Sequence, residues 1–112
     1  MAFTVTSESK NGIAQFTLVG ELDAAAAGSF REAVEQAAAS RPKRVVLIMD
    51  ALTYMASAGL RTLVFAKQKM GASVDIYVVG VQEPVRETLE MTGFQYSVVM
   101  LDTYNAAEIE NI

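Results

Sequence analysis

The chain has 112 residues, of which 52% are hydrophobic and 20% charged, so it is long enough for one globular domain with a single hydrophobic core. It contains no cysteine and no histidine, which excludes disulfides and cysteine or histidine metal ligands and removes the commonest general base; we therefore expect no enzyme activity, no metal and no cofactor. The net charge of −4, with no basic block, predicts no direct contact with nucleic acid.

The first half of the sequence predicts a β-hairpin, a helix and a buried strand. The first two strands meet at Lys10-Asn11-Gly12, a sequence that favours a tight turn. Asp23 is well placed to cap the helix that follows, and Pro42 ends this helix because proline disfavours helical angles at the preceding residue. The next strand is apolar without interruption, which is typical of a strand buried on both faces. These elements are expected at residues 3–8, 13–19, 24–39 and 43–49.

The second half of the sequence alternates helices and strands. One helix is expected to begin at Ser57, and another is expected to begin at Pro84 and to end at Gly93. Asp102 or Thr103 is expected to cap a last short helix. The Ser57 helix is expected to run to about residue 70, the two strands to cover residues 73–79 and 95–101, and the last helix to cover 105–110.

This order of elements predicts an α/β fold. Strands that alternate with helices form a largely parallel sheet with right-handed crossovers, and the opening hairpin makes that sheet mixed. We expect a mixed, mostly parallel sheet of four to five strands covered by about four helices, formed by residues 1–112 as a single domain. The chain shows no secretory leader and no apolar run of about 18 residues, so a cytoplasmic protein with no membrane insertion is expected.

The step from the third strand into the next helix contains a serine with two interpretations. Ser57 stands where the helix begins, where a serine side chain commonly accepts a hydrogen bond from the first turn. The same position suits a phosphate, because the free N–H groups and the helix dipole favour negative charge. No acidic residue lies between Asp50 and Asp75, whereas Arg61 is basic. On these residues alone, a helix cap is favoured over a phosphorylation site.

Three segments resemble the STAS domain family, whose bacterial branch contains anti-sigma factor antagonists. Residues 48–61 (Ile-Met-Asp-Ala-Leu-Thr-Tyr-Met-Ala-Ser-Ala-Gly-Leu-Arg) resemble the family signature Asp-Leu-Ser-Gly, a few apolar residues, and Asp-Ser-Ser-Gly-Leu. Residues 20–23 (Gly-Glu-Leu-Asp) resemble the family's sequence at the end of the second strand, and residues 85–94 resemble its late helix. Because the segments match in order and spacing, the resemblance implies a STAS fold over nearly the whole chain.

The resemblance implies a regulatory switch at Ser57, the position that matches the first serine of the signature. It implies that the unphosphorylated chain binds an anti-sigma factor serine kinase and releases a sigma factor. The kinase would phosphorylate Ser57, and a serine phosphatase would reset the switch. The phosphate would repel the partner's acidic surface or be poorly desolvated against it. The implied partner-binding residues are Asp23, Asp50, Tyr54, Met55, Ala56, Ser57, Ala58, Gly59 and Arg61.

The sequence departs from the signature at positions beside the serine. Ala56 replaces the motif aspartate and Ala58 the second serine, so a carboxylate that could orient Ser57 is missing and phosphorylation is expected to be slower or absent. Asp50 could supply some of that charge, although a solvated loop acid is the favoured interpretation. Asp23 is favoured as a helix cap over a contact residue. The cluster at Leu52, Tyr54 and Met55 is either core or an apolar patch for a partner, with core favoured for Leu52.

Two other functions stay open at this stage. The absence of the motif aspartate is compatible with a STAS interaction subunit of a transport system, or a signalling scaffold, that is never phosphorylated. An enzyme would depend on lysine or carboxylate chemistry alone. The sequence also leaves open whether two copies form a weak homodimer.

Overall fold

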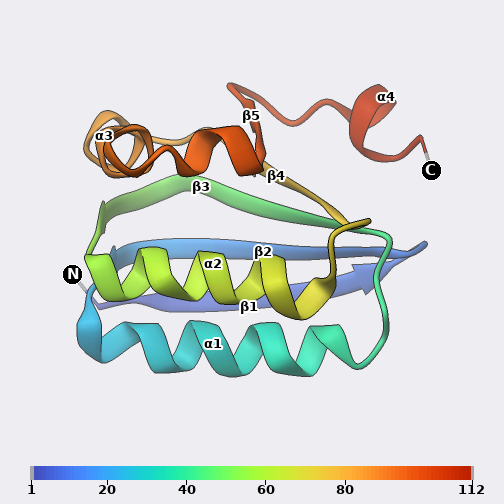
Figure 1. The fold of residues 1–112 in the computed structure, drawn as a ribbon, viewed down its shortest axis with the longest axis horizontal. Coiled ribbons are helices and arrows are strands. Elements are labelled where there is room, and N and C mark those ends of the chain that lie inside the picture. The colour runs from blue at the N-terminus through green and yellow to red at the C-terminus, as the bar shows by residue number, and fades with distance from the viewer. Residues whose placement is uncertain (1, 112) are drawn as a thin grey trace.

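Five strands form one sheet in the order β1-β2-β3-β4-β5, so each strand lies beside its neighbours in sequence. The computed structural model describes residues 2–111 (Figure 1). Strands β1 and β2 are antiparallel, and each later strand runs parallel to the one before it. This arrangement confirms the predicted mixed, mostly parallel sheet. The strands are β1 (Thr4–Lys10), β2 (Ile13–Leu22), β3 (Arg44–Met55), β4 (Asp75–Val79) and β5 (Val99–Leu101).

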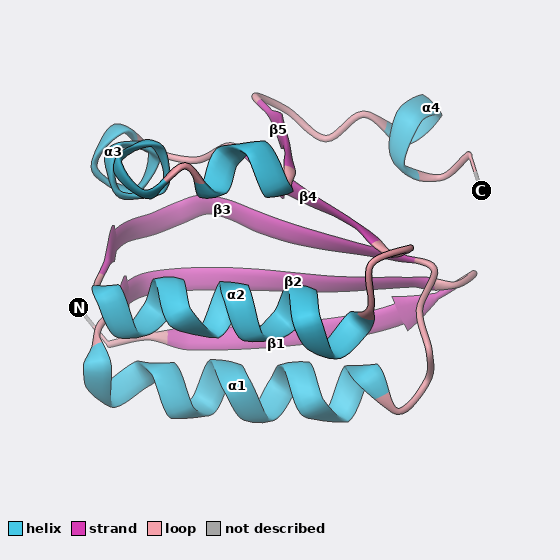
Figure 2. Cartoon of the chain, viewed as in Figure 1, coloured by secondary structure: helices cyan, strands magenta, loops and turns pink. Residues whose placement is uncertain are grey.

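Four α-helices and one 3-10 helix connect or follow these strands. Figure 2 shows α1 and α2 lying side by side across one face of the sheet, with α3 beyond β3. In the described part of the chain no helix is long and apolar enough to span a bilayer. The helices are α1 (Ala24–Ala38), α2 (Ser57–Met70), α3 (Glu83–Thr92), the 3-10 helix η1 (Phe94–Ser97) and α4 (Ala106–Ile109).

The main core lies between the sheet and helices α1, α2 and α3. Alternate residues of β2 point into it, because successive side chains of a strand face opposite sides. Phe16 of β2 meets Phe30 of α1 edge to face, with ring centroids 6.1 Å apart. The other helices bury residues at helical spacing, as the sequence predicts. The buried helical side chains include Phe30 and Val34 from α1, Leu63 and Ala66 from α2, and Val85 and Leu89 from α3.

The opposite face of the sheet is covered in part by the short helix α4. Ile109 is fully buried there against Val46, Tyr77 and Val79. Arg44, at the start of β3, donates hydrogen bonds from Nη1 to the backbone oxygens of Glu108 and Ile109, the latter at 3.0 Å. The predicted burial of the third strand on both faces is therefore correct over its first half, where Val45 and Val46 are both buried.

Three sequence predictions about boundaries need correction. The predicted strand at 95–101 is a strand only at Val99–Leu101, because η1 begins as Phe94 enters the core after α3. The last helix is capped by Asn105 and not by Asp102 or Thr103: its Oδ1 accepts from the Glu108 N–H at 3.1 Å. The third strand does not end at residue 49 but continues to Met55, since β2 also continues to Leu22 and pairs with it.

Candidate functional site

The ends of β2 and β3 determine where α1 and α2 begin. Leu22 and Met55 are paired, and the Ala56 N–H donates to the Leu22 backbone oxygen at 2.9 Å. Because the two strands are parallel and end together, both helices start at the same edge of the sheet, on the left in Figure 2. This edge carries the residues around Ser57.

Ser57 is the first residue of α2 and not its cap. Ala56 occupies the cap position with extended angles (φ −79°, ψ 168°), and the first helical hydrogen bond runs from the Leu60 N–H to the Ala56 backbone oxygen at 3.0 Å. The helix has no side-chain cap. The expectation that Ser57 caps the helix is therefore wrong. Its side chain is exposed and makes no hydrogen bond to any residue in the range 2–111.

Gly59 allows the start of α2 to approach β2 closely. A Cβ atom at this position would lie 2.7 Å from Leu22 Cγ and 3.1 Å from the Leu22 backbone oxygen, shorter than any ordinary contact. Gly59 is buried, so it acts beneath the site and presents no surface in the free chain. The structure shows a packing role for Gly59, and the contact with a partner that the resemblance implies stays a prediction.

The apolar residues before Ser57 separate into core and surface. Leu52 is fully buried and Met55 is 3% exposed, whereas Tyr54 is 46% exposed and pairs with Glu21 of β2. Met55 faces the core and pairs with Leu22, after an irregularity in the β2–β3 register between the Gly20–Leu52 and Glu21–Tyr54 pairs. Of these three side chains only Tyr54 reaches the surface, and a contact of Met55 with a partner stays a prediction.

Asp23 and Arg61 flank Ser57 with opposite charges. Asp23 caps α1, with Oδ1 accepting from the Ala26 N–H at 2.9 Å, which confirms the cap interpretation. Arg61 lies one helical turn after Ser57, where side chains four residues apart are neighbours. Arg61 is exposed and forms no ion pair within the described residues. Ala58 is half-buried.

Asp50 lies apart from this group, and it is an exposed acid, as the favoured interpretation has it, although it lies within β3 and not in a loop. Its Cα atom lies five residue steps before Met55 along the extended strand, a span of roughly 16 Å. Its carboxylate occupies the space beside Gly80, where a Cβ atom would be 2.2 Å from Asp50 Oδ1. Its backbone oxygen accepts from Gln82 Nε2 at 2.6 Å. Asp50 therefore connects β3 to the loop before α3.

The arrangement offers an accessible hydroxyl at the start of a helix. Nowhere in residues 2–111 do three or more carboxylates come together in a way that could hold a metal ion. The first-turn N–H groups of α2 and its dipole favour an anion at Ser57, and no side-chain cap competes for those N–H groups. The site is thus suited to receive a phosphate and to be contacted by another protein.

The comparisons with known proteins agree with this geometry. The family model described as STAS domain matches residues 4–108. The chain belongs to the STAS domain family. This STAS domain is 28% identical over 106 residues to the anti-sigma-F factor antagonist RsfB of Mycobacterium tuberculosis, a match that covers 95% of this chain and 87% of RsfB.

Solved structures share the fold of this STAS domain at low sequence identity. A crystal structure of an anti-sigma factor antagonist from Mycobacterium paratuberculosis superposes with a TM-score of 0.88 and 21% identity, covering 98% of this chain and 96% of that one. The phosphorylated form of the Bacillus cell fate determinant SpoIIAA has a TM-score of 0.72 and 18% identity, with 97% of both chains covered. These likenesses confirm the fold that the resemblance implied.

One residue of the site was not anticipated from the sequence. Leu22 forms the surface on which Gly59 packs and supplies the backbone oxygen that holds Ala56. Two features of the sequence could have pointed to it. A small residue stands in the first turn of α2, and an apolar residue stands at the end of β2, the strand that runs parallel to β3.

Proposed function

We propose that this STAS domain is an anti-sigma factor antagonist that binds an anti-sigma factor serine kinase, releases the sigma factor, and is switched off by phosphorylation of Ser57. The observation that carries the proposal is the exposed, unpartnered Ser57 side chain at the first position of α2. The name of the relative RsfB and the existence of a phosphorylated form of SpoIIAA support it. The role is regulatory and not enzymatic, and it places the protein in the cytoplasm with its partners.

The contact surface of the unphosphorylated chain would surround Ser57. Asp23, Tyr54, Ala58 and Arg61 lie around it, while Met55 and Gly59 support it from beneath. Tyr54 supplies an amphipathic side chain of the kind enriched in protein interfaces, and Asp23 and Arg61 supply rim charges. The kinase would bind over this surface.

Phosphorylation would change the charge at the centre of that surface. A phosphoserine carries about −1.5 to −2 charges and three acceptor oxygens at neutral pH. At Ser57 it would be stabilised by the α2 dipole and by Arg61, one turn away. The same charge would have to be desolvated in a complex and would repel an acidic partner surface, so binding would be lost. A serine phosphatase would restore it.

Binding of paired variants to a purified anti-sigma factor kinase tests the proposal. Isothermal titration calorimetry is expected to show retained binding for Ser57→Ala and at least tenfold weaker binding for Ser57→Asp, because only the second adds charge. Ser29→Asp, an exposed position in α1, is the matched control and should bind like the wild type. Equal affinity of Ser57→Asp and Ser57→Ala would reject the switch.

Ala56 favours a second candidate, an interaction subunit of a transport system or a scaffold that is never phosphorylated. Its side chain supplies no carboxylate to orient Ser57 or to help position a nucleotide in the kinase. Phosphosite mapping by mass spectrometry, on protein purified from its own cells with phosphatases inhibited, separates the two functions. A phosphate on Ser57 supports the antagonist. Its absence under every growth and stress condition, together with a membrane-complex partner, supports the second candidate.

A further inference from the structure

Basic residues gather at the edge of the sheet opposite Ser57, where β2 and β3 begin and where α1 and α2 end. Six of the nine lysines and arginines lie there, in the β1–β2 hairpin, in the segment that leads into β3, and in the last turn of α2. Arg44 is committed to the backbone of α4, and Lys67 Nζ donates to the Val74 backbone oxygen at 3.1 Å. The other four are Lys10, Arg41, Lys43 and Lys69.

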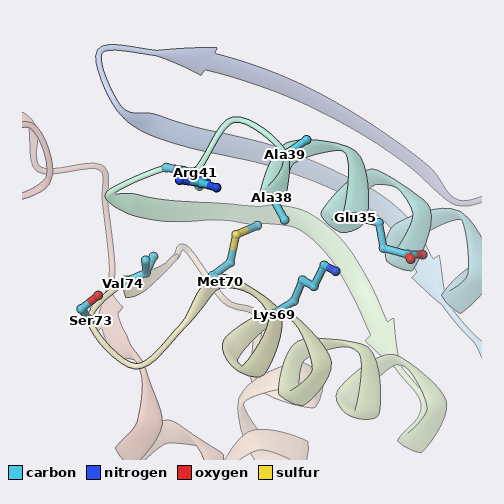
Figure 3. Close-up of a pocket in the computed structure, with 9 residues that line it drawn as sticks. Glu35, Ala38, Ala39, Arg41, Lys69, Met70, Ser73 and Val74 are labelled. Carbon is cyan, nitrogen blue, oxygen red and sulfur yellow. The ribbon is translucent and has the colours of Figure 1, made fainter.

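A cavity of about 590 Å³ lies within this basic edge, between the C-terminal ends of α1 and α2. The residues that line it include the apolar Ala38, Met70 and buried Val74. Figure 3 shows Arg41 and Lys69 reaching the cavity from different sides, with the Met70 side chain between them in that view. Small-molecule sites are commonly concave, apolar and about 300–1,000 Å³, with a few polar groups at fixed places.

Within residues 2–111 no acidic side chain pairs with either cation at the cavity, and Lys69 lies in the last turn of α2, where a positive charge also stabilises the helix C-terminus. No described residue forms an ion pair or side-chain hydrogen bond with Arg41 or Lys69. The Ala37 oxygen, in the last turn of α1, already accepts from Ser40 Oγ at 2.8 Å and from the Ser40 N–H at 3.1 Å. Glu35, the acid on the same rim, faces Arg31 at 3.9 Å. The positive charges are therefore free for a ligand.

The backbone at Arg41 is held in an unfavourable conformation. Its φ of +50° lies in the left-handed region, which arginine rarely adopts. Asn11 has a similar angle, but asparagine before glycine is the residue type that a tight hairpin turn favours. Non-glycine residues held in the left-handed region are strained and are concentrated at functional sites and ligand clamps.

From this cavity, these cations and this backbone we propose that the cleft between α1 and α2 binds a small organic anion with an apolar body, such as an aromatic or aliphatic ring that carries phosphate, sulfonate or carboxylate groups. The anionic groups would contact Arg41 and Lys69, and the apolar body would lie on Ala38, Met70 and Val74. The site lies at the far end of α2 from Ser57 and does not depend on the function proposed for that residue.

Titration with 1-anilinonaphthalene-8-sulfonate, an aromatic anion with environment-sensitive fluorescence, tests the site in the native full-length chain. Saturable binding is expected, roughly tenfold weaker in Arg41→Gly and in Lys69→Gln, as the loss of one charge-assisted contact predicts. Arg41→Gly also relieves the left-handed strain, so it should fold at least as stably as the wild type. Unfolding therefore cannot explain its weaker binding.

Control measurements distinguish binding of the probe at this site from nonspecific binding to the protein surface. Arg86→Gln removes one positive charge at the other edge, beside Asp102, and should leave probe affinity unchanged. In a ¹H–¹⁵N NMR titration, the amide shifts should concentrate at residues 38–43 and 69–74 and be absent at Ser57. Nonsaturable binding, equal loss in Arg86→Gln, or shifts centred elsewhere would overturn the proposal.

Discussion

Two helical glycines differ in the space available to a side chain. Gly59 would place a Cβ atom 2.7 Å from Leu22 Cγ, whereas Gly28, inside α1, has no atom within 4 Å of that position. Glycine weakens a helix relative to alanine by about 1 kcal/mol, so alanine is favoured wherever it fits. The two positions are therefore expected to respond to alanine in opposite directions.

Gly59→Ala is expected to lower the free energy of unfolding by about 1–3 kcal/mol, the usual cost of inserting a methyl group into a packed site. Urea denaturation followed by circular dichroism measures it. Gly28→Ala is the control and should raise the same free energy by about 0.5–1 kcal/mol. Stabilisation by both substitutions would show that Leu22 moves away without cost.

The caps of α1 and α2 form a second contrast at this scale. Asp23 accepts a hydrogen bond from the Ala26 N–H, while Ala56 leaves α2 without a side-chain cap. Ala56→Asp is expected to stabilise the chain by about 1 kcal/mol, and Asp23→Ala to destabilise it by about 0.5–2 kcal/mol, because a capping oxygen is gained or lost. Differential scanning calorimetry of both variants measures the effect. An unchanged Tm for Ala56→Asp would show that α2 needs no cap here.

The sequence correctly predicted that α2 begins at Ser57, but it placed the helix cap at Ser57 and not at Ala56, one residue earlier. Local propensity favours serine over alanine as the cap residue, so it points to the wrong one of these two neighbours. The choice is made by a contact distant in sequence, between the Ala56 N–H and the Leu22 backbone oxygen. The packing role of Gly59 likewise depends on Leu22, which is distant in sequence, so it could not be predicted from the residues of α2 alone.

Among the elements, α4 is attached to the sheet by few contacts. Ile109 is its one fully buried side chain in the described range, and Arg44 holds its last carbonyls. The segment from residue 102 to residue 108 is exposed throughout. Burial of one isoleucine contributes about 1.5–3 kcal/mol, so α4 should open before the rest of the fold does.

Ile109→Ala is expected to remove amide-exchange protection at residues 106–110 while β2 and β3 keep theirs. Hydrogen exchange measured by NMR in the native chain provides the test. Met91→Ala truncates a side chain that is 87% exposed and should change nothing. Loss of protection across the whole sheet in Ile109→Ala would mean that α4 and the sheet unfold as one unit.

A hydrogen bond between the two segments that flank α4 shifts the pKa of Tyr104. Its hydroxyl donates to Glu110 Oε2 at 2.6 Å, and this bond, with smaller effects of burial and of the Glu110 charge, raises the pKa of Tyr104 to about 12. The neutral phenol is therefore favoured in the folded chain. Its stabilisation is complete below pH 10, the ordinary pKa, and is lost as the pH rises toward 12.

Glu110→Gln is expected to lower the pKa of Tyr104 toward 10, because the charged acceptor is removed. The ¹³Cζ chemical shift of Tyr104 followed against pH reports it directly. The effect on global stability should be small, since Tyr104 is 39% exposed and solvent screens the interaction. A Tyr104 pKa that stays near 12 in Glu110→Gln would assign the shift to burial and not to the carboxylate.

Most elements could be predicted because their apolar residues have a clear period, and the exceptions lie where that period fails. Gln95, Tyr96 and Ser97 show no alternation, so only burial of Phe94 decides that the chain turns through η1 before β5. Likewise, β3 could not be followed past residue 49 because Asp50, Ala51 and Thr53 interrupt the apolar run. Its continuation depends on pairing with the end of β2.

For the whole molecule, the order of elements was enough to predict the layers. A hairpin followed by alternating helices and strands leads to a mostly parallel sheet with its main helices on one face, as observed. The position of α4 on the opposite face could not be predicted in the same way. A helix of one turn has no reliable period, and Ile109 finds its pocket among residues of β3 and β4.

The strand order also bears on how the chain can fold while it is being synthesised. Each strand after β1 pairs with the strand that is synthesised immediately before it. No strand therefore has to insert between two strands that are already present. The hairpin can form first on the ribosome, and β3, β4 and β5 can join one growing edge in turn as they emerge. The C-terminal α4 then closes over strands that are already paired.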